Sequence, residues 1–175
     1  MSPADKEKEA AKKTKVLFVC THNASRSQMA EGFLRHLGGG AFDVYSAGTE
    51  LGKLHPLAVE AMAEIGVDIS GQRAKSVDDF VQERFDYVIT VCDDANEACP
   101  FFPNAANRLH WSFPDPSAAG GTREEKLAVF RTVRDAIRGR MILDLLNAEM
   151  VFEYEQENNY RNSSRYRYSR TSGDR

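Results

Sequence analysis

Short apolar runs recur along the chain and predict the strands of a sheet. The run 16–19, Val-Leu-Phe-Val, is continuous and rich in β-branched residues, as expected of a strand that is buried on both faces of a parallel sheet. Alternating or apolar stretches over residues 42–46, 87–91 and 109–111 predict further strands. The pattern therefore predicts four strands.

Helical periodicity fills most of the intervals between these strands. Apolar residues recur every three or four positions over residues 29–37 and 58–65, and each of these segments is followed by glycine. A short helix is predicted over 77–81, and a long one begins at the capping box Thr122-Arg-Glu-Glu and continues to Leu145. Strands that alternate with helices predict an α/β domain with a mostly parallel sheet, whose ligand should lie at the carboxyl ends of the strands.

The two ends of the chain differ in composition from the rest. Residues 1–13 carry alternating charges and almost no large apolar side chain, which predicts a flexible lead-in. Residues 151–175 are polar, repetitive and rich in arginine and tyrosine, which predicts a disordered tail. One domain is therefore expected, over residues 14–150.

Charge and cysteine content restrict the class of protein. The 175 residues carry a formal net charge of −3, which gives no reason to expect nucleic acid or a membrane as a partner. The start of the chain lacks the apolar core of a signal peptide, and no run of about 18 apolar residues exists. A cytoplasmic monomer is therefore expected. Three cysteines are too few for a disulfide scaffold, so they are either core residues or reactive thiols.

Residues 20–27 have the features of an oxyanion-binding loop. Cys20 follows the first predicted strand, and Arg26 comes after five small or polar residues, where the first helix begins. Such a loop can wrap once, so that backbone N–H groups converge on the sulfur and the guanidinium closes the ring around a tetrahedral anion. This positive field favours the thiolate form of Cys20. The predicted oxyanion site comprises Thr21, His22, Asn23, Ala24, Ser25, Arg26 and Ser27.

Two residues of this loop have further expected roles. Asn23 tolerates the left-handed backbone conformation that a tight loop requires. Ser27 is expected to donate a hydrogen bond to the Cys20 sulfur.

Three motifs extend the pattern and resemble a known family. They are residues 16–32, which include the loop, Tyr45-Ser-Ala-Gly48, and His110 to Pro116. Over roughly residues 14–147 the chain resembles the low-molecular-weight phosphatase-like family, and specifically its thioredoxin-coupled arsenate reductases. The resemblance implies a four-stranded parallel sheet flanked by helices, no bound cofactor, and thioredoxin as the electron donor. His22 and Ser25 depart from the family's common glycine and cysteine.

A second cysteine cluster, Cys92 and Cys99, resembles the redox segment of the reductase branch. The resemblance implies that Cys20 attacks arsenate while Asp115 protonates the leaving oxygen, and that Cys92 then attacks the adduct and releases arsenite. Cys99 in turn attacks Cys92 and leaves a Cys92–Cys99 disulfide for thioredoxin. The polar residues over 93–96 predict only a marginal helix, which can loosen during this relay.

Two other functions fit part of the pattern. A phosphatase acting on phosphomonoesters would use the loop and Asp115, and would leave the second cysteine cluster without a role. A thiol-based sensor would bind an oxyanion and signal through a partner. Against the phosphatase, Ser117 follows Asp115-Pro116 where the phosphatase branch commonly has an aromatic residue.

Some members of the family bind a potassium ion beside the loop, and the residues at the corresponding positions can be compared. Asn23, Glu31 and Ser46 match three of the side chains that hold the ion, but Lys75 takes the place of an aspartate. The Lys75 ammonium is therefore expected to replace the cation. The histidines and cysteines show no metal-ligand spacing, and no metal site is predicted.

Overall fold

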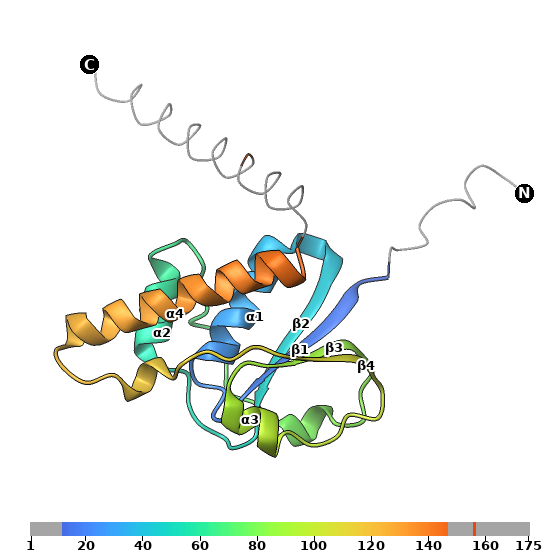
Figure 1. Ribbon diagram of the computed structural model, residues 1–175. Helices are drawn as coiled ribbons and strands as arrows, with labels where there is room; N and C mark the ends of the chain where they lie inside the picture. The colour runs from blue at the N-terminus through green and yellow to red at the C-terminus, as the bar shows by residue number, and fades with distance from the viewer. Residues whose placement is uncertain (1–11, 147–155, 157–175) are drawn as a thin grey trace, which may run out of the picture.

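One parallel sheet forms the centre of the computed structural model, which describes residues 12–146 and residue 156 (Figure 1). The four strands pair in the order β2-β1-β3-β4, and every pairing is parallel. This confirms the predicted four-stranded α/β fold. The predicted lead-in and tail lie outside the described residues, except for Lys12, Lys13 and Gln156. The strands are β1 (Thr14–Cys20), β2 (Phe42–Gly48), β3 (Phe85–Thr90) and β4 (Ala105–His110).

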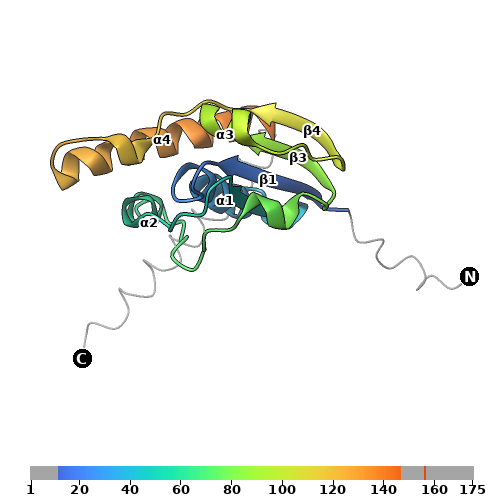
Figure 2. The ribbon, with the colours of Figure 1, turned by 90° about the horizontal axis from the view of Figure 1, so that it is seen from below.

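Four α-helices accompany the sheet within the described residues. Figure 1 shows α4 lying along α1 and α2, whereas α3 stands apart from these three and packs against β1 and β3. Figure 2 shows β1, β3 and β4 side by side in the order of the sheet. The helices are α1 (Arg26–Leu37), α2 (Pro56–Ala63), α3 (Asp93–Ala98) and α4 (Arg123–Asp144), with 3₁₀ turns η2 (Gly39–Ala41), η3 (Val77–Phe80) and η4 (Pro116–Ala118).

Local sequence signals determine where several helices begin and end. The predicted capping box opens α4, because the Thr122 side chain accepts from the Glu125 N–H and the Glu125 carboxylate accepts from the Thr122 N–H. Pro56 occupies the first turn of α2, where a missing N–H costs nothing. Gly66, with φ of 79°, takes the left-handed conformation after α2 that glycine adopts most readily.

Two sequence expectations were wrong in detail. The fourth strand begins at Ala105 and ends at His110, rather than covering 109–111. It is one of the two edge strands and its side chains are mostly exposed. Polar residues such as Asn107 therefore hide it from a search for apolar runs. Ile65 was expected on the buried face of the second helix, but it follows the end of α2 and is 40% exposed.

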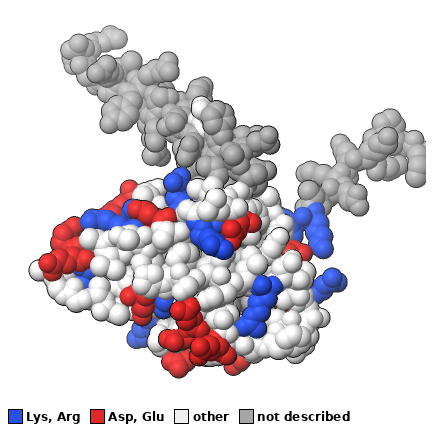
Figure 3. All heavy atoms as spheres, in the orientation of Figure 1, with Lys and Arg blue, Asp and Glu red and all other residues white. Residues whose placement is uncertain are grey.

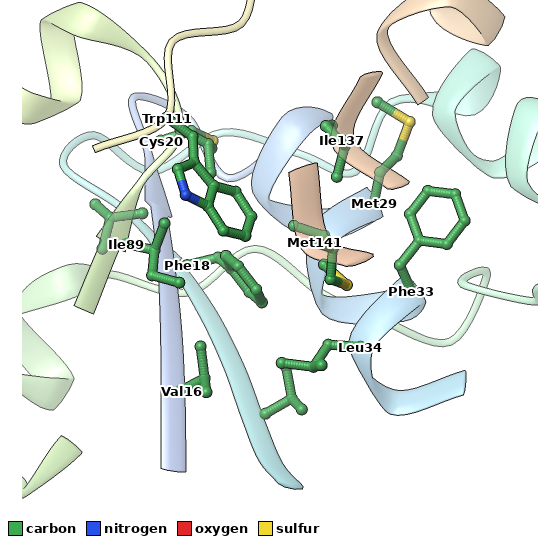
Figure 4. Close-up of a cluster of buried hydrophobic side chains, with 14 of the residues drawn as sticks. Val16, Phe18, Cys20, Met29, Phe33, Leu34, Ile89, Trp111, Ile137 and Met141 are labelled. Atoms are coloured by element: carbon green, nitrogen blue, oxygen red, sulfur yellow. The ribbon is translucent and has the colours of Figure 1, made fainter. Parts of the chain in front are cut away.

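The first strand is covered on both faces, as its sequence predicts. Residues Val16 to Cys20 are each exposed by 2% or less, and successive side chains of a strand point to opposite faces. Figure 4 shows Val16 and Phe18 on the side of β1 that faces Met29 of α1 and Met141 of α4. Burial of this central strand gives the loop that follows it a rigid base.

The parallel arrangement brings two of the cysteines to one edge of the sheet. The register pairs Val19 of β1 with Thr90 of β3, and the Val91 N–H donates to the Val19 carbonyl oxygen over 2.8 Å. Cys20 and Cys92 each follow within two residues of this pairing, at the carboxyl ends of their strands.

Among the described residues, no helix is both long and apolar enough to cross a membrane.

Candidate active site

The loop of residues 20–27 wraps around the sulfur of Cys20. The Asn23 N–H donates to Cys20 Sγ over 3.2 Å, and Ser27 Oγ lies 2.8 Å from the same sulfur. Asn23 has a φ of 52°, so its backbone is left-handed, as predicted. Cys20 is 2% exposed, yet its sulfur contacts polar groups, unlike that of a cysteine packed only among hydrocarbon side chains.

The side-chain amide of Asn23 connects the loop to its surroundings. Its nitrogen donates to Ser27 Oγ over 2.7 Å and to Ser46 Oγ over 2.9 Å. Its oxygen accepts from Gln28 Nε2 over 3.0 Å and from the Lys75 N–H over 2.9 Å. Because Ser27 Oγ accepts from Asn23, the hydroxyl proton of Ser27 is free to point at the sulfur, where it stabilises a thiolate.

The carbonyl groups of the loop are held away from the sulfur by a second segment, residues 49–55. Four loop carbonyls accept hydrogen bonds from backbone N–H groups of this segment, and carbonyls turned outward leave the loop's N–H groups on the inner side. The bonds are Thr49 to Cys20 (3.1 Å), Glu50 to Thr21 (2.7 Å), Gly52 to His22 (3.0 Å) and His55 to Ala24 (2.9 Å).

Gly48, at the end of β2, permits the close approach of these two segments. A Cβ atom at this position would lie 2.6 Å from the Glu50 carbonyl oxygen, 2.8 Å from that of Thr21 and 2.9 Å from the Asn23 nitrogen. In the sequence, Gly48 stands only as the last residue of the Tyr45-Ser-Ala-Gly48 motif, and no role was predicted for it. A glycine directly after a strand in such a motif was the available signal.

Behind the loop lies a buried carboxylate, Glu31, which is 2% exposed. Ser46 Oγ donates to its Oε2 over 2.7 Å, Arg35 pairs with its Oε1 at 2.8 Å, and Lys75 Nζ lies 3.5 Å from its Oε2. Lys75 Nζ also donates to the Arg73 carbonyl oxygen over 2.9 Å. Burial lowers the pKa of Lys75, and the negative charge of Glu31 opposes that change. The positive charges of Arg35 and Lys75 thus compensate the negative charge of the buried Glu31 carboxylate.

Arg26 and Asp115 meet at the opening of the loop. Arg26 donates to the Phe113 carbonyl oxygen over 3.0 Å, and its guanidinium lies 3.8 Å from the Asp115 carboxylate. Partial burial works to raise the pKa of Asp115, but hydrogen bonds from Ser117 and the charges of Arg26 and His22 outweigh it, so the pKa is lowered. Asp115 is therefore a carboxylate at neutral pH.

Cys92 lines a cavity at the opening of the loop. This cavity, of about 290 Å³, is lined by Thr21, Arg26, Cys92, Asp93 and Asp115 among others. Cys92 is the N-cap of α3, and its Sγ lies 3.5 Å from Thr21 Oγ1. The structure thus brings Cys92 against the loop that carries Cys20.

Cys99 lies at the other end of α3 and does not line that cavity. Its N–H donates to the Ala95 carbonyl oxygen over 2.8 Å, and its side chain is 9% exposed. Burial raises the pKa of the Cys99 thiol, an effect that the charge of Arg108 opposes. All three cysteines are free thiols.

The two departures from the family pattern occupy different environments. His22 Nε2 lies 3.0 Å from Glu50 Oε2 on the exposed side of the loop. Ser25 Oγ is buried and has no hydrogen-bond partner among the described residues. Within residues 12–146 and at 156, no group of three or more His, Cys, Asp or Glu side chains is placed to hold a metal ion.

Comparison with known proteins agrees with this geometry. Residues 15–151 match the family model for low molecular weight phosphotyrosine protein phosphatase. An arsenate reductase of Halalkalibacterium halodurans is 48% identical over 126 residues, which are 72% of this chain and 91% of the relative. A solved structure of an arsenate reductase in the phosphate binding state is 38% identical, with a TM-score of 0.64 over 73% of this chain and 92% of that one.

A third similar protein is described as dependent on thioredoxin. It is a thioredoxin-dependent arsenate reductase of Corynebacterium glutamicum, 34% identical with a TM-score of 0.55 over 75% of this chain and 61% of that one. The chain belongs to the low molecular weight phosphotyrosine protein phosphatase family and, within it, to the group of the arsenate reductases.

Proposed function

We propose that the protein reduces arsenate to arsenite, with Cys20 as the nucleophile and thioredoxin as the electron donor. The observation that carries the proposal is the position of a second thiol, Cys92, against the loop that surrounds Cys20. A phosphatase needs only one thiol at this place. A reductase needs a second thiol that can form a disulfide with the first. The relatives named as arsenate reductases support the same function.

In the first step the Cys20 thiolate attacks the arsenic atom of arsenate. The Asn23 N–H and Ser27 Oγ contact the attacking sulfur, and Arg26 binds the oxygens of the anion. Asp115 donates a proton to the oxygen that leaves as water. The negative charge of the bound anion raises the proton affinity of Asp115, which is how a carboxylate that is ionised in the free protein becomes an acid in the complex.

In the second step Cys92 attacks the Cys20 sulfur of the arsenic adduct. The sulfur–arsenic bond breaks, its electron pair reduces arsenic from the +5 to the +3 state, and a Cys20–Cys92 disulfide forms as arsenite leaves. Cys99 then attacks Cys92, which releases the Cys20 thiolate and leaves a Cys92–Cys99 disulfide. Because Cys99 is buried, α3 must open before thioredoxin can reduce that disulfide, and a six-residue helix opens at small cost.

A coupled assay tests the proposal. The protein is mixed with arsenate, thioredoxin, thioredoxin reductase and NADPH, and the loss of NADPH is followed. We expect a steady rate that requires both arsenate and thioredoxin. Hydrolysis of para-nitrophenyl phosphate without arsenate-dependent NADPH loss would instead identify a phosphatase. Anion binding with neither activity would identify a sensor.

We also propose that the Lys75 ammonium replaces the potassium ion that some family members bind beside the loop. The contacts of Lys75 Nζ with Glu31 and with the Arg73 carbonyl oxygen support this proposal. A second cation beside this ammonium would be repelled and would find Glu31 already compensated.

The activity should therefore not respond specifically to potassium. Exchange of sodium for potassium chloride at fixed ionic strength should leave the rate of the coupled assay unchanged. Lys75→Asp, which removes the ammonium and adds a carboxylate, should acquire a dependence on potassium. A clear rise in the rate of the unmodified protein with potassium would contradict the proposal.

We further propose that the protein works as a monomer in the cytoplasm. A reducing compartment keeps the three cysteines free before each catalytic cycle. The catalytic groups described above all come from one chain.

A further inference from the structure

The two ends of α3 are fastened to β4 by polar side chains. At the end that carries Cys92, the His110 imidazole lies 2.8 Å from the Asp93 carboxylate. At the end that carries Cys99, Arg108 donates to the Asn96 carbonyl oxygen over 3.0 Å. The two cysteines of the proposed relay therefore stand beside two different side chains of one edge strand.

Arg108 is the cation that acts on Cys99. The charged side chains of α3 itself, Asp93, Asp94 and Glu97, are all acidic, and Figure 3 shows acidic side chains gathered over this helix. The charged residues of the adjacent strands β1 and β3 lie near their amino ends, away from α3. On β4 the charged or titratable residues are Arg108 and His110, and His110 is engaged with Asp93 and with Thr90 Oγ1 at 2.8 Å.

The position of Cys99 disfavours ionisation of its thiol. The thiol is buried, so its ionisation is penalised, and it follows the carboxyl end of a helix, where unpaired carbonyl groups disfavour a negative charge. Arg108 counteracts both effects. Its guanidinium donates to the Asn96 carbonyl oxygen in the last turn of α3, and its positive charge opposes the rise in the pKa of Cys99 that burial causes.

We infer that Arg108 is a positioning residue that promotes ionisation of Cys99 and thereby speeds its attack on Cys92. The inference rests on the relay set out under the proposed function. In this step the Cys99 thiolate, having lost its proton to solvent, forms a bond to Cys92 Sγ. The Cys20–Cys92 bond breaks, and Cys20 leaves as a thiolate, so that no external oxidant or reductant is required.

Replacement of Arg108 with methionine tests the inference, because methionine keeps much of the side-chain length and removes the charge. The first readout is the rate at which iodoacetamide alkylates Cys99 in the reduced protein, resolved by mass spectrometry across a range of pH. Burial already raises the pKa of Cys99, and removal of the opposing charge raises it further. We therefore expect the pH profile of R108M to move to higher pH and that of Arg108→Lys to stay near the original.

The second readout is the rate of Cys92–Cys99 disulfide formation after one equivalent of arsenate without thioredoxin. We expect R108M to slow it by about threefold at neutral pH, since the loss of thiolate is partly offset by the higher nucleophilicity of a less acidic thiol. Arsenite release in that single turnover, which precedes the step, should be unchanged. Arg84→Met serves as the matched control, because Arg84 is an exposed arginine at the opposite end of the sheet.

The outcomes separate the inference from the proposed function. An unshifted alkylation profile in R108M would overturn the inference. So would faster disulfide formation, since it would mean that Arg108 only restrains α3. If the unmodified protein releases no arsenite or forms no Cys92–Cys99 disulfide, the proposed function fails, while the alkylation profile still decides whether Arg108 acts on Cys99.

Discussion

Replacement of Cys99 with serine should leave a protein that releases one equivalent of arsenite and then stops. Cys20 and Cys92 remain, so the first disulfide can form and arsenite can leave. That disulfide then has no internal thiol to resolve it, and it lies at the loop, where Cys20 is 2% and Cys92 3% exposed. Thioredoxin cannot reach a bond buried to this extent. The measurement is arsenite released per protein in the complete coupled assay, which should plateau at one.

The serine variant has an internal control for folding. Serine is close to cysteine in size, and the single equivalent of arsenite itself shows that the loop is intact. A small thiol that can enter the cavity should restart turnover by reducing the trapped disulfide. Steady turnover of the serine variant with thioredoxin alone would mean that the electrons do not pass through Cys99, and the relay would have to be abandoned.

Replacement of Gly48 with alanine should damage the site without touching any group that reacts. The added methyl group would lie within 3.0 Å of three backbone atoms, in residues 50, 21 and 23, and none of them can move as a flexible side chain would. Such overpacking costs about 1–3 kcal/mol of unfolding free energy. Displacement of the Asn23 N–H from the Cys20 sulfur by about 1 Å should lower the rate of arsenate reduction by about 100-fold.

Gly40→Ala is the matched control for this substitution. A Cβ atom on Gly40 would meet nothing within 4 Å, so both stability and activity should remain close to those of the unmodified protein. The measurements are urea denaturation and the coupled assay for both variants. If Gly48→Ala kept full activity, the fit between the 20–27 loop and residues 49–55 would not be what holds the loop in shape.

Features that depend on neighbouring residues in the chain were determined by the sequence itself. The loop from Cys20 to Ser27 is contiguous. The residue type at position 23 predicted the left-handed Asn23, and the loop pattern predicted the contact between Ser27 and the sulfur. The run 16–19 predicted a strand buried on both faces, because only a central strand can accept apolar side chains throughout. The capping box of Thr122 and Glu125 fixes the start of α4 by hydrogen bonds within a single turn, so it could be read from neighbouring residues.

Features that depend on residues distant in the chain were decided only by the tertiary structure. The family resemblance predicted that Asn23, Ser46 and Lys75 lie near one another, but not which atoms bond. The Asn23 amide bonds to Ser46 and to the Lys75 N–H, and Arg108 contacts the last turn of α3, because parallel strands and their loops converge at one edge of the sheet. No local periodicity encodes such contacts. The edge strand β4 was misplaced for a related reason, since one of its sides faces solvent and polar residues are stable there. The sequence thus predicted which groups react, and the packing of distant segments decided how each of these groups is held.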